Sequence, residues 1–158
     1  MPYQPLFPEL NTPGFVAGWA PLEDLQGELD PAEWQDISAA GTARRRDFIA
    51  GRRLARAISA SLELPPHPLR RGEDQSPVWP DDRAGSLSHG KTVCTAAIGK
   101  RDEVRSVGID IESVGRVEPK LWPTLFTERE VTYFASLESD QVAKETTLFF
   151  SAKETFYK

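Results

Sequence analysis

The fold prediction starts from one alternating run of residues, Val107-Gly108-Ile109-Asp110-Ile111-Glu112. Its branched apolar residues occupy every second position, which is the period of a half-buried strand. Asp110 and Glu112 would then leave the same face, about 7 Å apart at roughly 3.3 Å of rise per residue. Gly108 shares that face and would leave the backbone open to close approach by a ligand.

Two carboxylates beside a bare backbone position suit a hard cation. Mg²⁺ binds a few carboxylates together with water and substrate phosphate. The alternative is an ordinary strand with a solvated acidic face, because the spacing of Asp110 and Glu112 is common in proteins. The run alone leaves both interpretations open.

The composition indicates a globular protein of one domain or two small lobes. The chain has 158 residues, 39% of them hydrophobic and 27% charged, which is typical of soluble domains. No stretch reaches the roughly 18 apolar residues of a membrane span, and the N-terminus has no signal-peptide pattern. Cys94 is the only cysteine, so an internal disulfide and a cysteine-based zinc site are excluded. We therefore expect a cytoplasmic protein that does not bind membranes.

A long helix is predicted over residues 42–64. Its apolar positions form one stripe at about 100° per residue: Phe48, Gly51, Ala55, Ile58 and Leu62. A neighbouring stripe carries Arg45, Arg52 and Arg56. This basic edge is either solvated or binds an anion, and repulsion between clustered guanidinium groups favours the anion. Since the net charge is −5, non-specific nucleic-acid binding is not expected.

Shorter patterns predict the remaining elements. Residues 14–20 and 92–98 have the character of strands, and the second of these would pair with residues 107–112 as a hairpin. Asp30 caps a short helix that has Pro31 at its first position. Thr127 and Glu130 have the spacing of a capping box at the start of another helix.

The last helix is expected to begin near Lys144 or Thr147. Its apolar stripe would contain Phe149, Ala152 and Phe156. Glu154 and Lys158 would form an i, i+4 ion pair.

Five segments then follow one another in a recognisable order. They are the arginine-rich residues 44–56, Pro77-Val78-Trp79-Pro80, Gly85-Ser86-Leu87-Ser88-His89, the run at 107–112, and Lys153-Glu154 with Lys158. In this order and spacing the chain resembles the 4'-phosphopantetheinyl transferases of the Sfp type. The enterobactin-synthetase-associated branch is the nearest.

The resemblance implies a function. Members of this family transfer the 4'-phosphopantetheine arm of coenzyme A to a serine of an acyl or peptidyl carrier protein, with Mg²⁺, and release adenosine 3',5'-bisphosphate. Such enzymes serve siderophore, polyketide or nonribosomal peptide biosynthesis. We expect a monomer that acts on coenzyme A and an apo carrier protein. The alternatives are a coenzyme A or nucleotide-binding fragment without turnover and a metal phosphohydrolase.

The resemblance also implies roles for individual residues. The metal ligands would be Asp110, Glu112 and Glu154, with Glu154 also a candidate for the base. Coenzyme A would be bound by Arg44, Arg45, Arg52, Ser88, His89, Lys153 and Lys158, with Lys158 near the transferring phosphorus. For His89 taken alone, an ordinary hydrogen-bonded loop histidine is the alternative.

The implied fold is α+β, a pseudo-twofold pair of α/β lobes of the 4'-phosphopantetheinyl transferase fold. Residues 1–105 would form the N-terminal lobe, with the arginine helix and the Ser-His loop. Residues 106–158 would begin the C-terminal lobe. Relatives continue for tens of residues beyond the Lys158 position, so we expect the second lobe to be truncated at its C-terminus.

Overall fold

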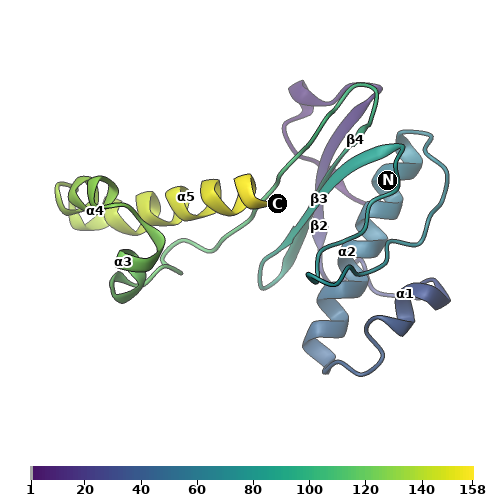
Figure 1. Cartoon of the computed structure of the whole chain (residues 1–158), viewed down its shortest axis with the longest axis horizontal. Helices are drawn as coiled ribbons and strands as arrows, with labels where there is room; N and C mark the ends of the chain where they lie inside the picture. The colour runs from purple at the N-terminus through teal and green to yellow at the C-terminus, as the bar shows by residue number, and fades with distance from the viewer. Residues whose placement is uncertain (1) are drawn as a thin grey trace.

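An antiparallel sheet covered on one face by a long helix forms the first part of the molecule (Figure 1). The computed structural model describes residues 2–158. The spatial order of the strands is β1 (Gln4–Pro5), β2 (Phe15–Pro21), β4 (Val93–Lys100) and β3 (Arg83–His89), and each neighbouring pair is antiparallel. The 3₁₀ turn η1 (Pro8–Leu10) lies between β1 and β2 along the chain. The strands predicted at residues 14–20 and 92–98 are therefore confirmed as β2 and β4.

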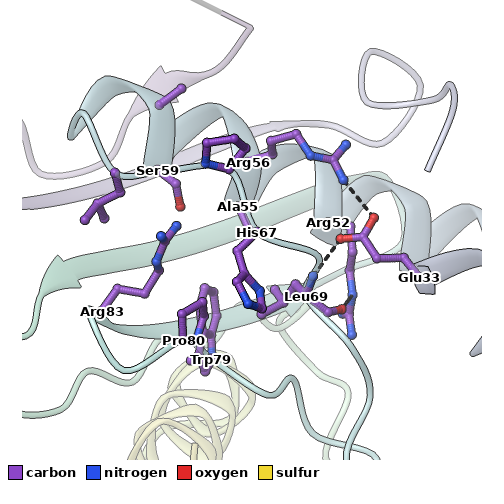
Figure 2. Close-up of a pocket in the computed structure, with 13 residues that line it drawn as sticks. Glu33, Arg52, Ala55, Arg56, Ser59, His67, Leu69, Trp79, Pro80 and Arg83 are labelled. Carbon is purple, nitrogen blue, oxygen red and sulfur yellow. Dashed lines mark hydrogen bonds and ion pairs between the residues drawn. The ribbon is translucent and has the colours of Figure 1, made fainter. Parts of the chain in front are cut away.

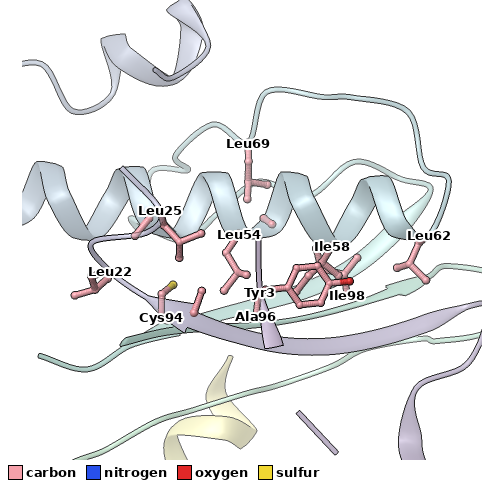
Figure 3. Packing of buried hydrophobic residues seen from close by; sticks show 13 residues of the cluster. Tyr3, Leu22, Leu25, Leu54, Ile58, Leu62, Leu69, Cys94, Ala96 and Ile98 are labelled. Carbon is pink, nitrogen blue, oxygen red and sulfur yellow. The ribbon is translucent and has the colours of Figure 1, made fainter. Parts of the chain in front are cut away.

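Helix α2 (Thr42–Ser61) builds the main core against the sheet (Figure 3). All five residues of the predicted apolar stripe are buried, and Ala50 and Leu54 widen the buried face. Cys94 and Ala96 of β4 pack against this face. Small residues on the central strand let the helix approach closely, so the prediction of a core-facing α2 is confirmed.

The short helix α1 (Pro31–Gln35) begins as predicted at Asp30. The Asp30 side chain accepts a hydrogen bond from Ala32 N at 2.8 Å, and Glu33 reaches back to Asp30 N at 3.2 Å. This reciprocal pair satisfies amide groups that a helix N-terminus otherwise leaves free.

The last part of the chain is a separate group of helices that lies away from the sheet (Figure 1). It contains the 3₁₀ turn η2 (Pro119–Leu121), α3 (Trp122–Leu125), α4 (Glu128–Ala135) and α5 (Ser139–Tyr157). The predicted capping box at Thr127 is confirmed at the start of α4. Phe134 is fully buried at the centre of a small aromatic cluster.

The predicted start of the last helix was wrong, because α5 already begins at Ser139. The first turns contain Asp140, Gln141 and Lys144, which are exposed and give no apolar signal. The predicted stripe is also only partly buried. Phe149 packs into the aromatic cluster, whereas Phe156 is 88% exposed.

The prediction of a strand at residues 107–112, paired as a hairpin with residues 92–98, was wrong. The segment is extended but is not part of a strand, and β4 pairs instead with β2 and β3. Its amides at Ile109 and Ile111 donate to the hydroxyls of Ser86 (3.1 Å) and Ser88 (3.3 Å) on β3. The alternation of apolar residues therefore reflects a half-buried segment that does not pair with a strand through backbone hydrogen bonds.

Gly108 does allow a close approach, but the approaching group belongs to the protein. A Cβ atom at this position would collide with the carbonyl oxygen of Thr155 on α5. Because Gly108 has no side chain, the last turns of α5 can pack against the extended segment. The end of α5 therefore lies beside the sheet (Figure 1).

The α+β class is confirmed, with helices and an antiparallel sheet in one chain. The pseudo-twofold relation, the truncated second lobe and the boundary between residues 105 and 106 stay predictions. Within residues 2–158, no helix combines the length and apolar character that crossing a membrane requires.

Candidate functional site

Strand β3 presents two sets of side chains to opposite faces of the sheet. Leu87 packs with the α2 core, and His89 lies 3.7 Å from Asp47 of α2 (Nδ1 to Oδ2). Ser86 and Ser88 face the other way and hold the extended segment that carries Asp110. Because successive strand residues alternate in direction, β3 connects a basic helix on one side with an acidic segment on the other.

Asp110 lies at the centre of the acidic side, and its side chain is only 2% exposed. Its Oδ1 accepts from Ser88 Oγ at 2.8 Å and from Lys158 Nζ at 2.5 Å. Lys158 also donates to Ser88 Oγ at 3.0 Å. Burial opposes ionisation of Asp110, but the hydrogen bonds from Lys158 and Ser88 outweigh it and lower the pKa of the carboxyl.

The Lys158 ammonium group does not form the predicted i, i+4 ion pair with Glu154. It contacts Asp110 and Ser88 instead. Glu154 itself is half-buried on α5. It lies on the same helical face as Ser151 and Lys158, which approach the acidic segment. The terminal turns of α5 thus turn one polar face toward Asp110.

A divalent cation fits part of this arrangement. Asp110 Oδ2 is a buried acceptor that has no hydrogen-bond partner among residues 2–158. Glu112 is 9% exposed and pairs with Arg116 at 3.0 Å. Within the described residues, however, no three acidic, histidine or cysteine side chains lie together as a metal-binding group. Asp110 and Glu112 are suited to a hard cation, while the three-ligand set with Glu154 stays a prediction.

The basic side is a cavity of about 170 Å³ beneath the end of β3. Four of the predicted coenzyme A ligands line it, Arg44, Arg52, Ser88 and His89, although the Ser88 hydroxyl itself is turned to Asp110 on the acidic side. Arg71 lines the same cavity, although the sequence patterns gave it no role. The neighbouring Gln75 has φ of 73°, a strained value for a residue other than glycine.

Arg52 is held rigidly in the wall of this cavity. Its side chain donates from Nε to the carbonyl oxygen of Leu69 at 2.9 Å and stacks 3.9 Å from the centroid of the Phe48 ring. Burial lowers its pKa to about 10; Glu33 and Asp36 oppose this shift, and Arg71 and Arg44 add to it by repulsion. The guanidinium therefore stays charged near neutral pH and is available to an anion from a fixed position.

A second cavity of about 480 Å³ shares part of its lining with the basic one. Both cavities are lined by Asp47 and His89, and the second also contains Glu112, Lys91 and Arg46. The two cavities are therefore neighbours at Asp47 and His89, one bordered by the guanidinium groups and the other by Glu112. A ligand with several phosphates along its length matches this succession of charges.

Three of the predicted coenzyme A ligands line neither cavity: Arg45, Lys153 and Lys158. Arg45 donates to the carbonyl oxygen of Ser38 at 2.6 Å and lies over the ring of Trp34. Lys153 pairs with Glu130 of α4 at 2.7 Å, where it joins α5 to its neighbouring helix. Their roles in binding coenzyme A stay predictions. The contact of Lys153 with Glu130 is consistent with a role of Lys153 in orienting α5.

A separate pocket of about 260 Å³ lies on the other side of Arg52, near Trp79 (Figure 2). Its wall contains Glu33 of α1, which is 1% exposed. Glu33 accepts from Arg56 at 2.7 Å and from the amide of Leu69 at 2.8 Å, the two dashed contacts in Figure 2. Glu33 thus ties α1, α2 and the loop after α2 together behind the basic cavity. The sequence gave no signal for it beyond the capping pattern.

Comparison with known proteins supports the same family for both parts of the chain. Residues 32–99 match the model of the 4'-phosphopantetheinyl transferase N-terminal domain, and residues 106–158 match that of the 4'-phosphopantetheinyl transferase superfamily. Enterobactin synthase component D of Escherichia coli is 30% identical over 155 residues, covering 83% of this chain and 67% of that protein. The chain belongs to the 4'-phosphopantetheinyl transferase superfamily.

Other members of the superfamily are also similar. The transferase PptT of Mycobacterium tuberculosis is 35% identical over 133 residues, which cover 81% of this chain and 56% of that protein. The transferase Npt of Nocardia iowensis is 34% identical over 136 residues, covering 86% and 60%. The chain therefore spans little more than half the length of these two relatives.

Proposed function

We propose that this protein transfers the 4'-phosphopantetheine arm of coenzyme A to a serine hydroxyl of an acyl or peptidyl carrier protein. Family membership supports this activity. The observation that carries it is the pair of neighbouring cavities at the end of β3, one lined by Arg44, Arg52 and His89 and the other by His89 and Glu112. Coenzyme A has a matching order of groups, with a phosphorylated nucleotide at one end and a diphosphate next to the pantetheine arm.

In the proposed reaction the serine oxygen of the carrier attacks the phosphorus that bears the pantetheine arm. A new oxygen–phosphorus bond forms, and the bond to the bridging diphosphate oxygen breaks. The electron pair leaves with adenosine 3',5'-bisphosphate. The serine proton passes to a base, for which Glu154 is the candidate because it lies on the α5 face toward Asp110.

The basic residues would hold the leaving nucleotide. Arg52 offers a charge in a fixed orientation, and Arg44 and His89 complete the wall around its phosphate. Lys158, whose ammonium group is already beside Asp110, would reach the diphosphate. Fixed cations near the attacked phosphorus favour the transition state because they need no rearrangement as charge develops.

A magnesium ion held by Asp110 and Glu112, with Glu154 as the proposed third ligand, would neutralise charge on the diphosphate. The buried, unpartnered Oδ2 of Asp110 supports this proposal within the described part of the chain.

The decisive experiment is intact mass spectrometry of an apo carrier protein incubated with this chain, coenzyme A and Mg²⁺. We expect the carrier to gain one phosphopantetheine. Asp110→Asn and Glu154→Gln should abolish the gain, whereas Glu118→Gln should not, since Glu118 is 61% exposed and pairs with the surface residue Lys120. Normal transfer by both the Asp110 and the Glu154 variant would contradict the roles proposed for these acids.

A second candidate function is binding of coenzyme A without turnover. The observation that favours it is the direct contact of Lys158 with Asp110, together with the lack of a three-residue metal group among residues 2–158. Calorimetric titration of coenzyme A, run beside the mass assay, separates the two functions. Binding without a mass gain would favour this second function.

A further inference from the structure

We propose that the pocket of about 260 Å³ beside Trp79 is a second ligand site, and that it binds a small aromatic carboxylate. This Trp79 pocket is separate from the basic cavity, since among the described residues the two share only Arg52 in their walls. Such a site is independent of the proposed transferase activity.

Apolar side chains form most of the wall of the Trp79 pocket. They come from α2, from the loop after it and from the segment before β3: Ala55, Leu64, Pro66, Leu69, Trp79 and Pro80. The volume of about 260 Å³ lies just below the roughly 300–1,000 Å³ that is usual for ligand pockets. The pocket is therefore suited to a small apolar ligand of one or two rings.

The Trp79 ring is held in place by the sheet. A Cβ atom at Gly85 of β3 would collide with three carbon atoms of this ring, so the indole packs directly on the bare backbone of the strand. The ring cannot move toward the sheet and presents a fixed aromatic surface to the pocket. A fixed surface of this kind favours an aromatic ligand, because little side-chain freedom is lost on binding.

Arg83 supplies the polar end of the pocket. Its side chain is only 4% exposed. Nε and Nη2 contact the Asp82 carboxylate at 2.7 and 2.9 Å, and Nη2 also donates to the carbonyl oxygen of Pro65 at 2.9 Å. These contacts fix the guanidinium but leave Nη1 without a partner among residues 2–158. The pocket thus contains a buried donor with unused capacity.

Ser59 of α2 marks the place where the ligand oxygen atoms would lie. The residue is 6% exposed and lines the pocket, and the Arg83 guanidinium points toward it (Figure 2). A guanidinium and a hydroxyl that converge in an apolar wall can bind the two oxygens of one carboxylate.

The charges around the pocket favour a monoanion. Three guanidinium groups line it, those of Arg52, Arg56 and Arg83. Only two carboxylates pair with them, since Glu33 contacts Arg56 at 2.7 Å and Asp82 contacts Arg83 at 2.7 Å. One positive charge is left over, and a carboxylate balances it. A phosphate dianion would instead leave negative charge uncompensated beside an apolar wall.

The test uses 2-naphthoate as the probe and the neutral 2-naphthamide as its matched control, on the chain free of coenzyme A. Two-dimensional NMR of the ¹⁵N-labelled chain follows binding. We expect saturable shifts at the Trp79 indole N–H, which Trp79→Phe identifies, and at the amide of Ser59. Naphthoate should bind about tenfold more tightly than naphthamide, as expected for a hydrogen bond to a charged group.

Two variants test the polar end of the pocket. Arg83→Lys removes Nη1 and should abolish most of the preference for naphthoate. Arg105→Lys is the matched control, because Arg105 is exposed and does not line the pocket. Ser59→Ala should reduce the preference about three- to tenfold. Melting curves without probe identify a variant that has lost its fold, and Ser59→Ala, which removes a single hydroxyl, carries the test if Arg83→Lys unfolds.

A third variant tests the aromatic wall. Gly85→Ala should push the Trp79 ring into the pocket and weaken both probes to the same degree. Gly90→Ala is its control, since the added methyl group would lie 3.8 Å from the nearest side chain.

The contrary outcomes are specific. If naphthoate caused no saturable shift at Trp79, the site would not exist. Equal affinity for the two probes, or a preference that is unchanged in both Arg83→Lys and Ser59→Ala, would overturn the carboxylate assignment. Shifts centred on His89 would place naphthoate in the basic cavity and would also overturn the inference. The mass assay with carrier protein, coenzyme A and Mg²⁺ tests the transferase activity separately.

Discussion

The two halves of the molecule bury their apolar residues to different degrees. The sheet and α2 enclose a continuous core in which Leu54, Ile58 and Ile98 are fully buried. The helical part has a much smaller cluster around Phe134, and on α5 it leaves Phe156 and Tyr157 88% and 84% exposed. The first half has the packing of an independent folding unit, whereas the second depends more on its few aromatic contacts and on its attachment to the sheet.

The largest effect is expected from Phe134→Ala, which removes the centre of the aromatic cluster. The Phe134 ring packs edge-on against Trp122, Phe126 and Phe149. The change should destabilise the helical part by about 3–5 kcal/mol. Hydrogen exchange should show loss of protection in α4 and α5 while α2 and β4 stay protected. Phe156→Ala is the control. If α2 lost as much exchange protection as α4 and α5, the two halves would unfold as one unit.

A somewhat smaller loss is expected from Leu54→Ala in the sheet core. Leu54 is 0% exposed, and the lost contacts and residual cavity should cost about 2–5 kcal/mol of unfolding free energy. Urea unfolding followed by circular dichroism measures the shift in midpoint. Leu10→Ala, at a 58% exposed position, should change little. A comparably large effect of Leu10→Ala would contradict the distinction between core and surface.

The attachment between the halves is tested by Gly108→Ala. The added methyl group would collide with the Thr155 carbonyl and force the end of α5 away from the extended segment. We expect a cost of about 1–3 kcal/mol, with exchange protection lost at residues 107–112 and 154–158 and both cores intact. Gly90→Ala is the control, because its methyl group would lie 3.8 Å from the nearest side chain. Unchanged protection would contradict the close approach.

The smallest effect concerns the dependence of stability on pH at Asp36. The hydrogen bond from Arg70 lowers the pKa of Asp36 below its ordinary 3.8. Its stabilising effect is therefore complete above that value and is lost as the pH falls through the lower, folded-state pKa. Asp36→Asn should be less stable than the wild type at about pH 6, and the difference should shrink toward about pH 3. A constant difference in urea melts would contradict the role of the charge.

The sequence predicted those elements whose signals are local. The capping groups of Asp30 and Thr127 and the apolar stripe of α2 depend on residues within a few turns, and all were confirmed. Strand β3 was missed because Gly85, Ser86 and Ser88 have low strand propensity, and only pairing with β4 makes the segment a strand. The run at 107–112 shows the opposite error, because a strand was predicted where none forms. Its alternating pattern fits a strand, but its amides donate to serine hydroxyls.

The candidate site was predictable to the extent that its residues lie in linear motifs. Arg44, Arg52, Ser88 and His89 were named from the sequence, and the fold brings them to one cavity. Arg71 was given no role of its own because its neighbour Arg70 has the same residue type, and only the contacts with Asp36 distinguish them. Contacts that join residues about 35 positions apart leave no periodic trace in the sequence.

The serine contacts of the extended segment have a mechanical consequence. Two amide-to-hydroxyl bonds and the Lys158 contacts join the helical half to the sheet, and a typical bond of this kind contributes only about 0.5–1.5 kcal/mol. Few hydrogen bonds therefore fix the orientation of the helical half relative to the sheet. A ligand that touches the guanidinium groups and Lys158 at once would stiffen this joint, and small-angle scattering should record a narrower distribution of interatomic distances.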